Sequence, residues 1–334
     1  QAELAFSSQT NLVWGENASG KTSVLEAIFL VGRGRSFRTG HLDPISRFGS
    51  KGFQVVAQVA ASFGTTPVGL ARQQGNLKAR IGGRPAAGLA ELAETLPVQL
   101  VDSQAHLLVD GSPRYRRQFL DWGVFHVEHN FLSSWRRYQR ALKQRNSLLR
   151  MASPATDALF APWEAELAQS AHQIDSQRRA YLDLLRPKLL ASMAGVLPEL
   201  GAPDLRYRRG WSEEQDLAEQ LREQRGRDLA RGHTTLGAHR ADWSIAFEQA
   251  PLREHLSRGQ EKLTALACML AQAELYAEHR GEWPVVCLDD LASELDQAHQ
   301  AAVVAQLISA DAQILLTGTE LPQALQSLPS RVVH

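Results

Sequence analysis

The sequence predicts an α/β protein with one domain built from both ends of the chain and a helical domain inserted between them. In the first hundred residues and in the last third, strand-like segments alternate with helices. The apolar runs near the C-terminus are typical of parallel strands covered on both faces. From residue 112 to about 194 the apolar period is helical, and a mixed connector follows, with a charged helix around 212–231. We therefore assign residues 1–111 and 235–334 to a discontinuous domain and residues 112–234 to an inserted helical lobe.

The strands of the discontinuous domain are expected in two groups. Three alternating segments, with Gly75-Asn76 as a turn signal between the last two, predict an antiparallel region laid beside the first strand. The other segments alternate with helices along the chain. The expected strands are NLVW, FQVVAQVAASF, VGLARQQG, NLKARIGG, LPVQLVDS, WSIAFE, WPVVCLDD and AQILLTGT.

The inserted lobe contains two segments with helical periodicity, separated by the sequence ASPATD. Their apolar side chains recur at three, four or seven residues, which predicts a short antiparallel helix pair with a bundle core. The expected core residues are Leu132, Trp135, Tyr138, Leu142 and Leu149, followed by Phe160, Trp163, Leu167, Ala171, Ile174, Tyr181 and Leu185.

The composition is that of an ordinary globular protein, with 44% hydrophobic and 22% charged residues in a chain of 334. No apolar run approaches the length of about 20 residues that a membrane span needs. The two cysteines, Cys268 and Cys287, lie in apolar surroundings without a metal-binding spacing. So few cysteines fit a reducing compartment, and we expect a cytoplasmic protein.

The formal net charge of zero conceals an uneven distribution of charge. Residues 113–150 carry nine Arg or Lys against two acidic residues, whereas residues 281–334 carry seven acidic residues against one Arg. The basic run indicates either a polyanion-binding surface or a solvated helix face. Nothing in it resembles a module that reads bases, so contacts to phosphates are the expected mode. The candidate DNA-binding residues are Arg114, Arg116, Arg117, Arg136 and Arg137.

The first strand leads into a phosphate-binding loop that matches G-x-x-x-x-G-K-[ST] between a strand and a helix. Glycine allows backbone N–H groups to curl around phosphate oxygens. We expect Lys21 to lie between the β- and γ-phosphates and Thr22 to bind Mg²⁺. The expected nucleotide-binding residues are Gly15, Glu16, Asn17, Ala18, Ser19, Gly20, Lys21, Thr22 and Ser23.

Two aspartates follow the apolar strand Val285–Leu288. We expect Asp289 to hold Mg²⁺, either directly or through a water molecule. Asp290 would then point at the γ-phosphate and orient or deprotonate the attacking water. A pair of aspartates at a strand end is often only solvated, but the phosphate-binding loop favours the functional interpretation.

A second candidate anion site, Ser257-Arg258-Gly259-Gln260, opens a helix more than 200 residues after the loop. This second site is explained if it serves a nucleotide that is bound by another copy of the chain. We therefore expect a homodimer that buries two ATP molecules. Each would be held by the Lys21 loop of one subunit and capped by Ser257, Gly259, Gln260 and the helix N-terminus of the other.

These motifs resemble those of ABC-type ATPases. The stretch SRGQEK resembles their signature motif, in which Arg258 would also contact the partner subunit, and Ser293 and Asp296 in SELD resemble their dimer-contacting loop. Gln104 falls where the family's glutamine loop lies and would contact Mg²⁺. Thr317-Gly318-Thr319 occupies the switch position, where transporters usually have His, and Thr319 is the catalytic candidate within it. By this resemblance Asp290, Lys21, Gln104 and Thr319 are the catalytic candidates. The implied fold is an ABC-type P-loop ATPase head, with a mixed sheet, flanking helices and an antiparallel β subdomain.

Five further stretches together resemble the RecF family of bacterial recombination mediators, whose head is of the SMC/ABC kind. They are GENASGKTSVLEAIFLVGRGRSFRT, GSPRYRRQFLDWGVF, TTLGAHRADW, LSRGQEKL and CLDDLASELD, and they lie in the same order from residue 15 to 296. The resemblance implies a slow Mg²⁺-dependent ATPase that dimerises with ATP on double-stranded and gapped DNA. It also implies action at single-strand gaps and stalled forks with RecR, with RecO and RecA downstream. For His239 and Arg240, which match the family pattern, we expect a structural hydrogen-bonding role.

Four alternatives remain open at this point. The first is the nucleotide-binding subunit of a transporter, against which stand the SRGQEK variant of the signature, the Asp-Asp pair and the long insertion. The second is a chromosome-structure ATPase with long coiled-coil arms, for which about forty helical residues, or about 60 Å, are too short. A single-chain kinase leaves Ser257–Gln260 unexplained, and an inactive interaction protein conflicts with intact Lys21, Thr22 and Asp289.

Overall fold

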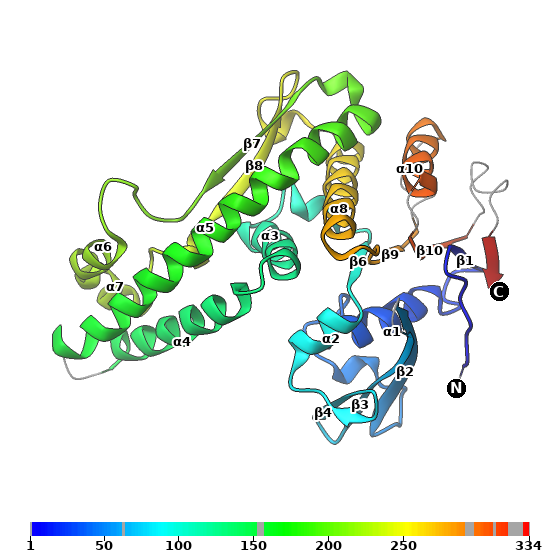
Figure 1. The fold of residues 1–334 in the computed structure, drawn as a ribbon, viewed down its shortest axis with the longest axis horizontal. Coiled ribbons are helices and arrows are strands. Elements are labelled where there is room, and N and C mark those ends of the chain that lie inside the picture. Colours follow the sequence, from blue (N-terminus) through cyan, green and yellow to red (C-terminus); the bar gives the residue numbers. More distant parts are fainter. Residues whose placement is uncertain are drawn as a thin grey trace. The chain divides into compact units, whose positions relative to one another are not determined.

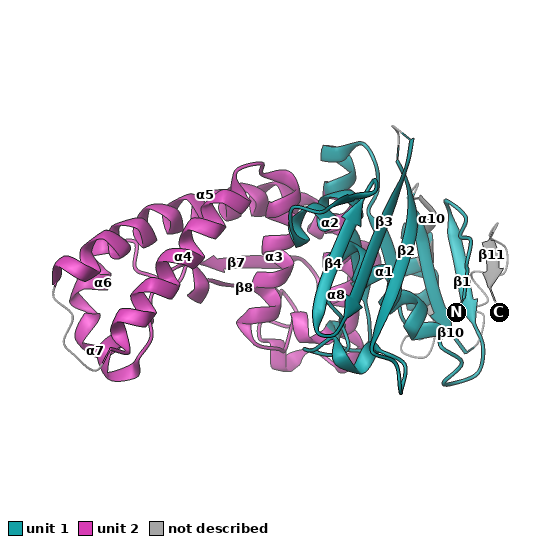
Figure 2. Cartoon of the chain, turned by 90° about the horizontal axis from the view of Figure 1, so that it is seen from below, with its two compact units in different colours: residues 1–105, 276–334 teal, residues 106–275 magenta. Residues whose placement is uncertain are grey.

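The computed structural model describes residues 2–61, 64–151, 157–290, 297–309, 312–319 and 330–333. The chain forms two compact units, one of residues 1–105 and 276–334 and the other of residues 106–275 (Figure 2). The first unit joins the two ends of the chain, as expected of a discontinuous domain. The second begins close to the expected boundary but continues beyond residue 234 to Leu275. Compactness does not by itself define a functional domain, so the boundaries at 111/112 and 234/235 stay a prediction.

The first unit contains a five-stranded sheet in which each pair of neighbouring strands is parallel (Figure 1). Because the strands are parallel, the loops that follow β1, β10, β9 and β6 leave the same edge of the sheet, where α/β proteins bind their ligands. The strands in spatial order are β11 (Ser330–Val333), β1 (Thr10–Trp14), β10 (Ile314–Gly318), β9 (Val285–Leu288) and β6 (Val98–Val101).

The expected antiparallel strands form a separate four-stranded sheet in the same unit. Among the described residues none of them pairs with β1, and helix α1 (Lys21–Arg33) packs against both sheets. In the described part of the chain the antiparallel sheet is therefore not hydrogen-bonded to the first strand. Helix α1, which packs against both sheets, connects the two. The sheet consists of β2 (Gly52–Ala61), β3 (Gly64–Gln73), β4 (Asn76–Ile81) and β5 (Arg84–Pro85), and helices α2 (Leu89–Thr95) and α10 (Gln297–Ser309) complete the unit.

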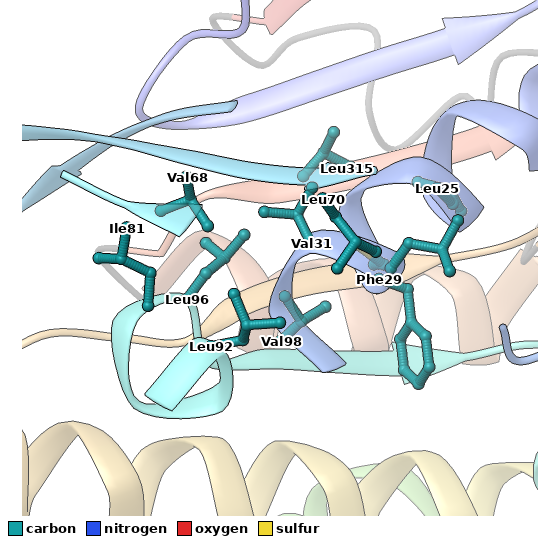
Figure 3. Packing of buried hydrophobic residues seen from close by; sticks show 12 residues of the cluster. Leu25, Phe29, Val31, Val68, Leu70, Ile81, Leu92, Leu96, Val98 and Leu315 are labelled. Atoms are coloured by element: carbon teal, nitrogen blue, oxygen red, sulfur yellow. The ribbon is translucent and has the colours of Figure 1, made fainter. Parts of the chain in front are cut away.

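Helix α1 owes its position to a core that it shares with both sheets (Figure 3). Leu25 and Val31 of the helix are fully buried against Leu70 of the antiparallel sheet and Leu315 of the parallel sheet. Burial of a side chain of this size contributes about 1.5–3 kcal/mol. The helix ends at Gly34, whose left-handed φ of 64° lets its N–H close a bond to the carbonyl of Leu30. This packing fixes the N-terminus of α1, and with it the phosphate-binding loop.

The second unit contains the expected antiparallel helix pair, α4 (Phe131–Leu149) and α5 (Asp157–Val196). Contacts from Ser134 to Gln173 and from Arg145 to Glu164 run in opposite directions along the two helices. Nearly all of the expected core residues are at least partly buried, but Trp135 is 39% exposed. Helix α3 (Pro113–Val127) precedes the pair, and α8 (Arg258–Arg280) follows Ser257.

The connector after α5 differs from the sequence prediction. The single charged helix expected around 212–231 is two short helices, α6 (Leu217–Glu223) and α7 (Arg225–Arg231). Strand β7 (Pro203–Arg208) was not predicted, because it becomes a strand only by pairing with β8 (Asp242–Phe247), 34 residues or more further along. Among the described residues the 3-10 helices are Asp43–Ile45, Ala105–Leu108, Pro198–Leu200, Ala238–Arg240 and Arg253–His255. Within the described residues no helix is both long and apolar enough to cross a membrane.

His239 has the structural role expected of it. Its Nε2 lies 3.1 Å from the carbonyl oxygen of Thr234, so Nε2 carries the proton, and Nδ1 accepts the Tyr138 hydroxyl at 2.6 Å. Burial, followed by the charges of Arg240 and Arg117, lowers the pKa of His239 to about 4. The imidazole is therefore neutral in the folded protein and ties the loop before β8 to helix α4.

This neutral histidine predicts a pH dependence of stability. Between pH 6.5 and pH 4 the unfolded chain binds a proton at His239 that the folded chain does not, so stability falls as the pH falls. We expect a loss of about 2–3 kcal/mol over this window. Urea unfolding of His239→Gln at several pH values should show a flatter dependence. The exposed His233→Gln serves as the control, and a wild-type slope in His239→Gln would contradict the assignment.

Candidate nucleotide-binding site

The phosphate-binding loop has a backbone that L-residues adopt only under constraint. Gly20 has a φ of 101° and Ala18 a φ of 66°, and the N–H of Ser19 bonds to the carbonyl of Glu16 at 3.2 Å. The loop ends at the first turn of α1, where free N–H groups and the helix dipole favour an anion. Gly15 is anchored to the neighbouring strand by its N–H, 3.4 Å from the carbonyl of Gly318. The result is a loop suited to a polyphosphate.

The side chains of Lys21 and Thr22 both lie beside the phosphate-binding loop. The Lys21 ammonium donates to the carbonyls of Gly15 at 2.7 Å and Glu16 at 2.8 Å, so the charge lies over the loop. The Thr22 hydroxyl lies 3.2 Å from Oδ1 of Asp289, although the two residues are 267 positions apart. A hydroxyl and a carboxylate are hard oxygen ligands of the kind that Mg²⁺ prefers. The donor set therefore fits a magnesium ion beside the phosphates.

Thr317 of β10, which the sequence placed in the switch segment without a role of its own, connects the two aspartates. Its hydroxyl donates to Oδ1 of Asp289 at 2.5 Å and accepts from the N–H of Asp290 at 3.0 Å. The carbonyl of Thr317 accepts the same N–H at 3.1 Å. Asp290 has a left-handed φ of 54°, which is uncommon for a residue other than glycine and marks a constrained position. Only the pairing of β10 with β9 brings Thr317 to this point.

We expect Thr317→Val to slow ATP hydrolysis while ATP binding is largely kept. The change preserves shape but removes a charge-assisted hydrogen bond to Asp289, worth about 1.5–3 kcal/mol. Single-turnover hydrolysis and nucleotide binding should be measured side by side. Thr317→Ser, which keeps the hydroxyl, should restore the rate. Equal rates in the Val variant and the wild type would remove Thr317 from the site.

Cys287 lies in the strand immediately before the aspartates and is fully buried. Burial, together with the Asp289 charge, raises the pKa of its thiol to about 12. The thiol is therefore protonated and has no place in the chemistry.

The other catalytic candidates are not in contact with this cluster. Gln104 is exposed three residues after β6, and its backbone N–H bonds to Oδ1 of Asp102 at 3.0 Å. Thr319 is exposed after the end of β10, while Thr317 makes the contact to Asp289. Both side chains therefore stay predictions that a bound nucleotide would test. Ser293 and Asp296 lie outside the described residues.

The signature segment in the second unit is a helix start with a reciprocal cap. The Ser257 hydroxyl accepts the N–H of Gln260 at 3.3 Å, and Oε1 of Gln260 accepts the N–H of Ser257 at 3.0 Å. This is a capping box, which holds the helix N-terminus in one conformation. Arg258 is turned to Asp110 at 3.0 Å, and an added Cβ on Gly259 would meet only the Ser257 hydroxyl, at 4.0 Å. The segment is therefore preformed, with an open face at its glycine.

The basic run of residues 113–150 divides into structural and exposed charges. Arg116 is buried in a two-point ion pair with Asp242, at 2.7 and 3.1 Å, which argues against the predicted phosphate contact. Arg117 donates to the carbonyl of Ala241, and Arg137 forms a two-point pair with Glu166. Arg114 and Arg136 are exposed and stay candidates for DNA contacts.

The fold and the site together define an ATPase head of the SMC and ABC kind, and comparison with known proteins agrees. The family model described as the RecF/RecN/SMC N-terminal domain matches residues 1–326. Curated proteins described as DNA replication and repair protein RecF are similar over nearly the whole chain. The one from Stenotrophomonas maltophilia (strain R551-3) is 46% identical over 98% of this chain and 91% of its own. The one from Xanthomonas euvesicatoria pv. vesicatoria (strain 85-10) is 45% identical over 97% and 89%.

Solved structures give the same result. The structure described as the recombination mediator protein RecF-ATPrS in the RecFOR pathway has a TM-score of 0.86 and 25% identity, covering 99% of this chain and 91% of that one. The Smc head domain from Pyrococcus furiosus has a TM-score of 0.54 at 15% identity, covering 94% and 84%, and so shares the fold. The chain belongs to the RecF family of DNA replication and repair proteins. The transporter alternative is not favoured.

Proposed function

We propose that the protein is an ATP-dependent DNA clamp in which nucleotide binding joins two copies and slow hydrolysis releases them. The observation that carries this proposal is the Thr22–Asp289–Thr317 cluster beside the phosphate-binding loop, held within hydrogen-bond distance from three separate stretches of the chain. Membership of a DNA replication and repair family, and likeness to a structure described as RecF-ATP, support ATP as the nucleotide.

In hydrolysis some side chains of the protein would bind the nucleotide and Mg²⁺, and another would accept a proton. Lys21 would leave the loop carbonyls and bind the β- and γ-phosphate oxygens. Thr22 and Asp289 would hold Mg²⁺, which neutralises charge on the phosphates when bound. Asp290 would orient the attacking water and accept its proton. Asp is one methylene shorter than the Glu of transporter ATPases, so the water would be held less favourably and hydrolysis would be slow.

The open glycine face of the signature segment suits the nucleotide of a second copy. The Ser257 hydroxyl accepts within its capping box but keeps its own proton free to donate to a phosphate oxygen. The N-terminus of the 23-residue helix α8 adds a favourable dipole. ATP would then satisfy donors from both subunits, and loss of the γ-phosphate would weaken the dimer.

The family places this cycle in recombinational repair. We propose action on double-stranded and gapped DNA in the cytoplasm, with RecR as the direct partner and RecO and RecA acting downstream. The exposed arginines Arg114 and Arg136 are the proposed phosphate contacts on the helical unit. Contacts to phosphates alone would leave recognition of a gap to its shape or to partners.

Binding to labelled gapped duplex should require ATP and should be lost in ADP or without nucleotide. We expect Lys21→Ala to lose ATP binding and DNA binding together, because the ammonium is the main positive charge of the loop. Lys78→Ala, an exposed lysine of the antiparallel sheet, is the matched control. DNA binding that is absent in every nucleotide state, with ATP still hydrolysed, would refute the clamp.

A further inference from the structure

The helical unit contains a cavity that the proposed function does not use. It has a volume of about 440 Å³ and lies at the end of β7, where the chain turns towards α6. Ligand sites typically measure about 300–1,000 Å³. Four arginines line it against a single carboxylate, that of Glu213, so the cavity carries a positive charge. The arginines are Arg179, Arg208, Arg209 and Arg240.

The four arginines differ in the ion pairs and hydrogen bonds that their guanidinium groups form within the protein. Arg179 is fixed by Asp175 at 3.1 Å and Glu213 at 2.5 Å. Arg209 donates to the carbonyl of Ser212 at 2.6 Å. Arg208 is 83% exposed and lies 3.7 Å from Asp242, at the outer limit of an ion pair. Among the described residues Arg240 forms no ion pair. Two guanidinium groups at this cavity are therefore available to an incoming anion.

Trp211 is a nearly buried member of the cavity lining. It is only 7% exposed, and its indole N–H is inaccessible to solvent. The Arg209 guanidinium covers one face of the Trp211 ring, 4.8 Å from its centre. The donors that the cavity offers to oxygen atoms are therefore the guanidinium groups of Arg208 and Arg240.

We propose that this cavity holds phosphate groups of a DNA strand, independently of sequence. Phosphate oxygens match the paired N–H donors of the Arg208 and Arg240 guanidinium groups. Two further arginines belong to the same unit. Arg117 donates to the carbonyl of Ala241, the residue after Arg240, and the exposed Arg114 lies one turn earlier on α3. Several arginines suit a polymer with many phosphates better than a single carboxylate. The inference rests on the proposed DNA-binding function, for which it names a contact surface.

The double variant Arg208→Ala/Arg240→Ala tests the proposal in the full chain. Anisotropy of fluorescein-labelled duplex and single-stranded oligonucleotides should be titrated in ATPγS and Mg²⁺ over a range of NaCl concentrations. Each lost phosphate contact should lower the salt slope by about 0.9 for duplex or about 0.7 for a single strand. Arg206→Ala is a stringent control, because Arg206 lies two residues away on the same strand, is 70% exposed and is paired with Asp204.

The possible results of this titration distinguish the cavity site from the proposed ATP-dependent clamp. A smaller salt slope of DNA binding in the double variant supports the cavity as a phosphate site. ATP hydrolysis by the double variant and the salt slope of Arg206→Ala should then be unchanged. Wild-type slope in the double variant would overturn the cavity site and leave the clamp standing. Failure of the wild type to bind DNA in any state would overturn both. Competition by polyglutamate but not by phosphate or oligonucleotide would assign the cavity to an acidic peptide instead.

Discussion

Replacement of Asp290 by Asn is expected to leave ATP binding intact and to slow hydrolysis about 100- to 10,000-fold. The carboxylate is the only proposed proton acceptor for the attacking water, and an amide cannot take that role. Asn keeps the side-chain shape and tolerates the left-handed φ of 54° at this position. The N–H bond to the Thr317 hydroxyl at 3.0 Å should also survive, since it involves only the backbone of residue 290.

Single-turnover hydrolysis with the protein in excess would measure the rate of the chemical step, because product release does not limit that rate. Binding of a fluorescent ATP analogue would be measured in parallel. Glu94→Gln removes an exposed carboxylate from helix α2 of the same unit and serves as the control. An unchanged rate in Asp290→Asn would exclude Asp290 as the base. A loss of binding as well would show that the side chain holds the nucleotide and not the water.

Replacement of Arg145 by Met is expected to destabilise the helical unit by about 3–5 kcal/mol. Arg145 is 0% exposed and donates to Asp228 at 2.7 Å, Glu164 at 3.1 Å and the carbonyl of Leu221 at 2.9 Å. Removing the guanidinium leaves carboxylates buried without their cation. Glu164 keeps a second partner in Arg225, at 2.7 Å, so the main cost falls on Asp228, which is itself fully buried.

Urea unfolding followed by tryptophan fluorescence would test this expectation. The signal reports mainly the second unit, which contains Trp122, Trp135, Trp163, Trp211 and Trp243 among the seven tryptophans.

Arg137→Met on the same helix is the matched control, because the solvent-screened pair of Arg137 with Glu166 should contribute little to stability. The double variant Arg145→Met/Asp228→Asn should regain part of the loss, since it removes the stranded charge. Equal stabilities of the two single variants would contradict the buried-charge account.

Much of the nucleotide site could be predicted from the sequence, because the chemistry there follows from local backbone and strand order. A glycine at position 20 and a lysine at 21 need only the strand before and the helix after to form a phosphate loop. Asp289 follows an apolar run whose parallel neighbours end at the same edge. The sequence placed Thr317 in the switch segment, but its contact with Asp289 could not be predicted in this way. Threonine is common in strands, and its role depends on the register that sets β10 beside β9.

The basic run shows most clearly what the tertiary structure decided. By sequence Arg116, Arg137 and Arg145 are equivalent members of one positive stretch, and two of them were expected to face DNA. In the fold Arg116 meets Asp242, which is 126 residues away, and Arg145 meets Asp228, which is 83 residues away.

The sequence alone determined the class of protein, the phosphate loop and the acidic strand end, since these depend on neighbours along the chain. Which charges are structural, which are free, and where four arginines surround a cavity depended on partners that only folding brings together.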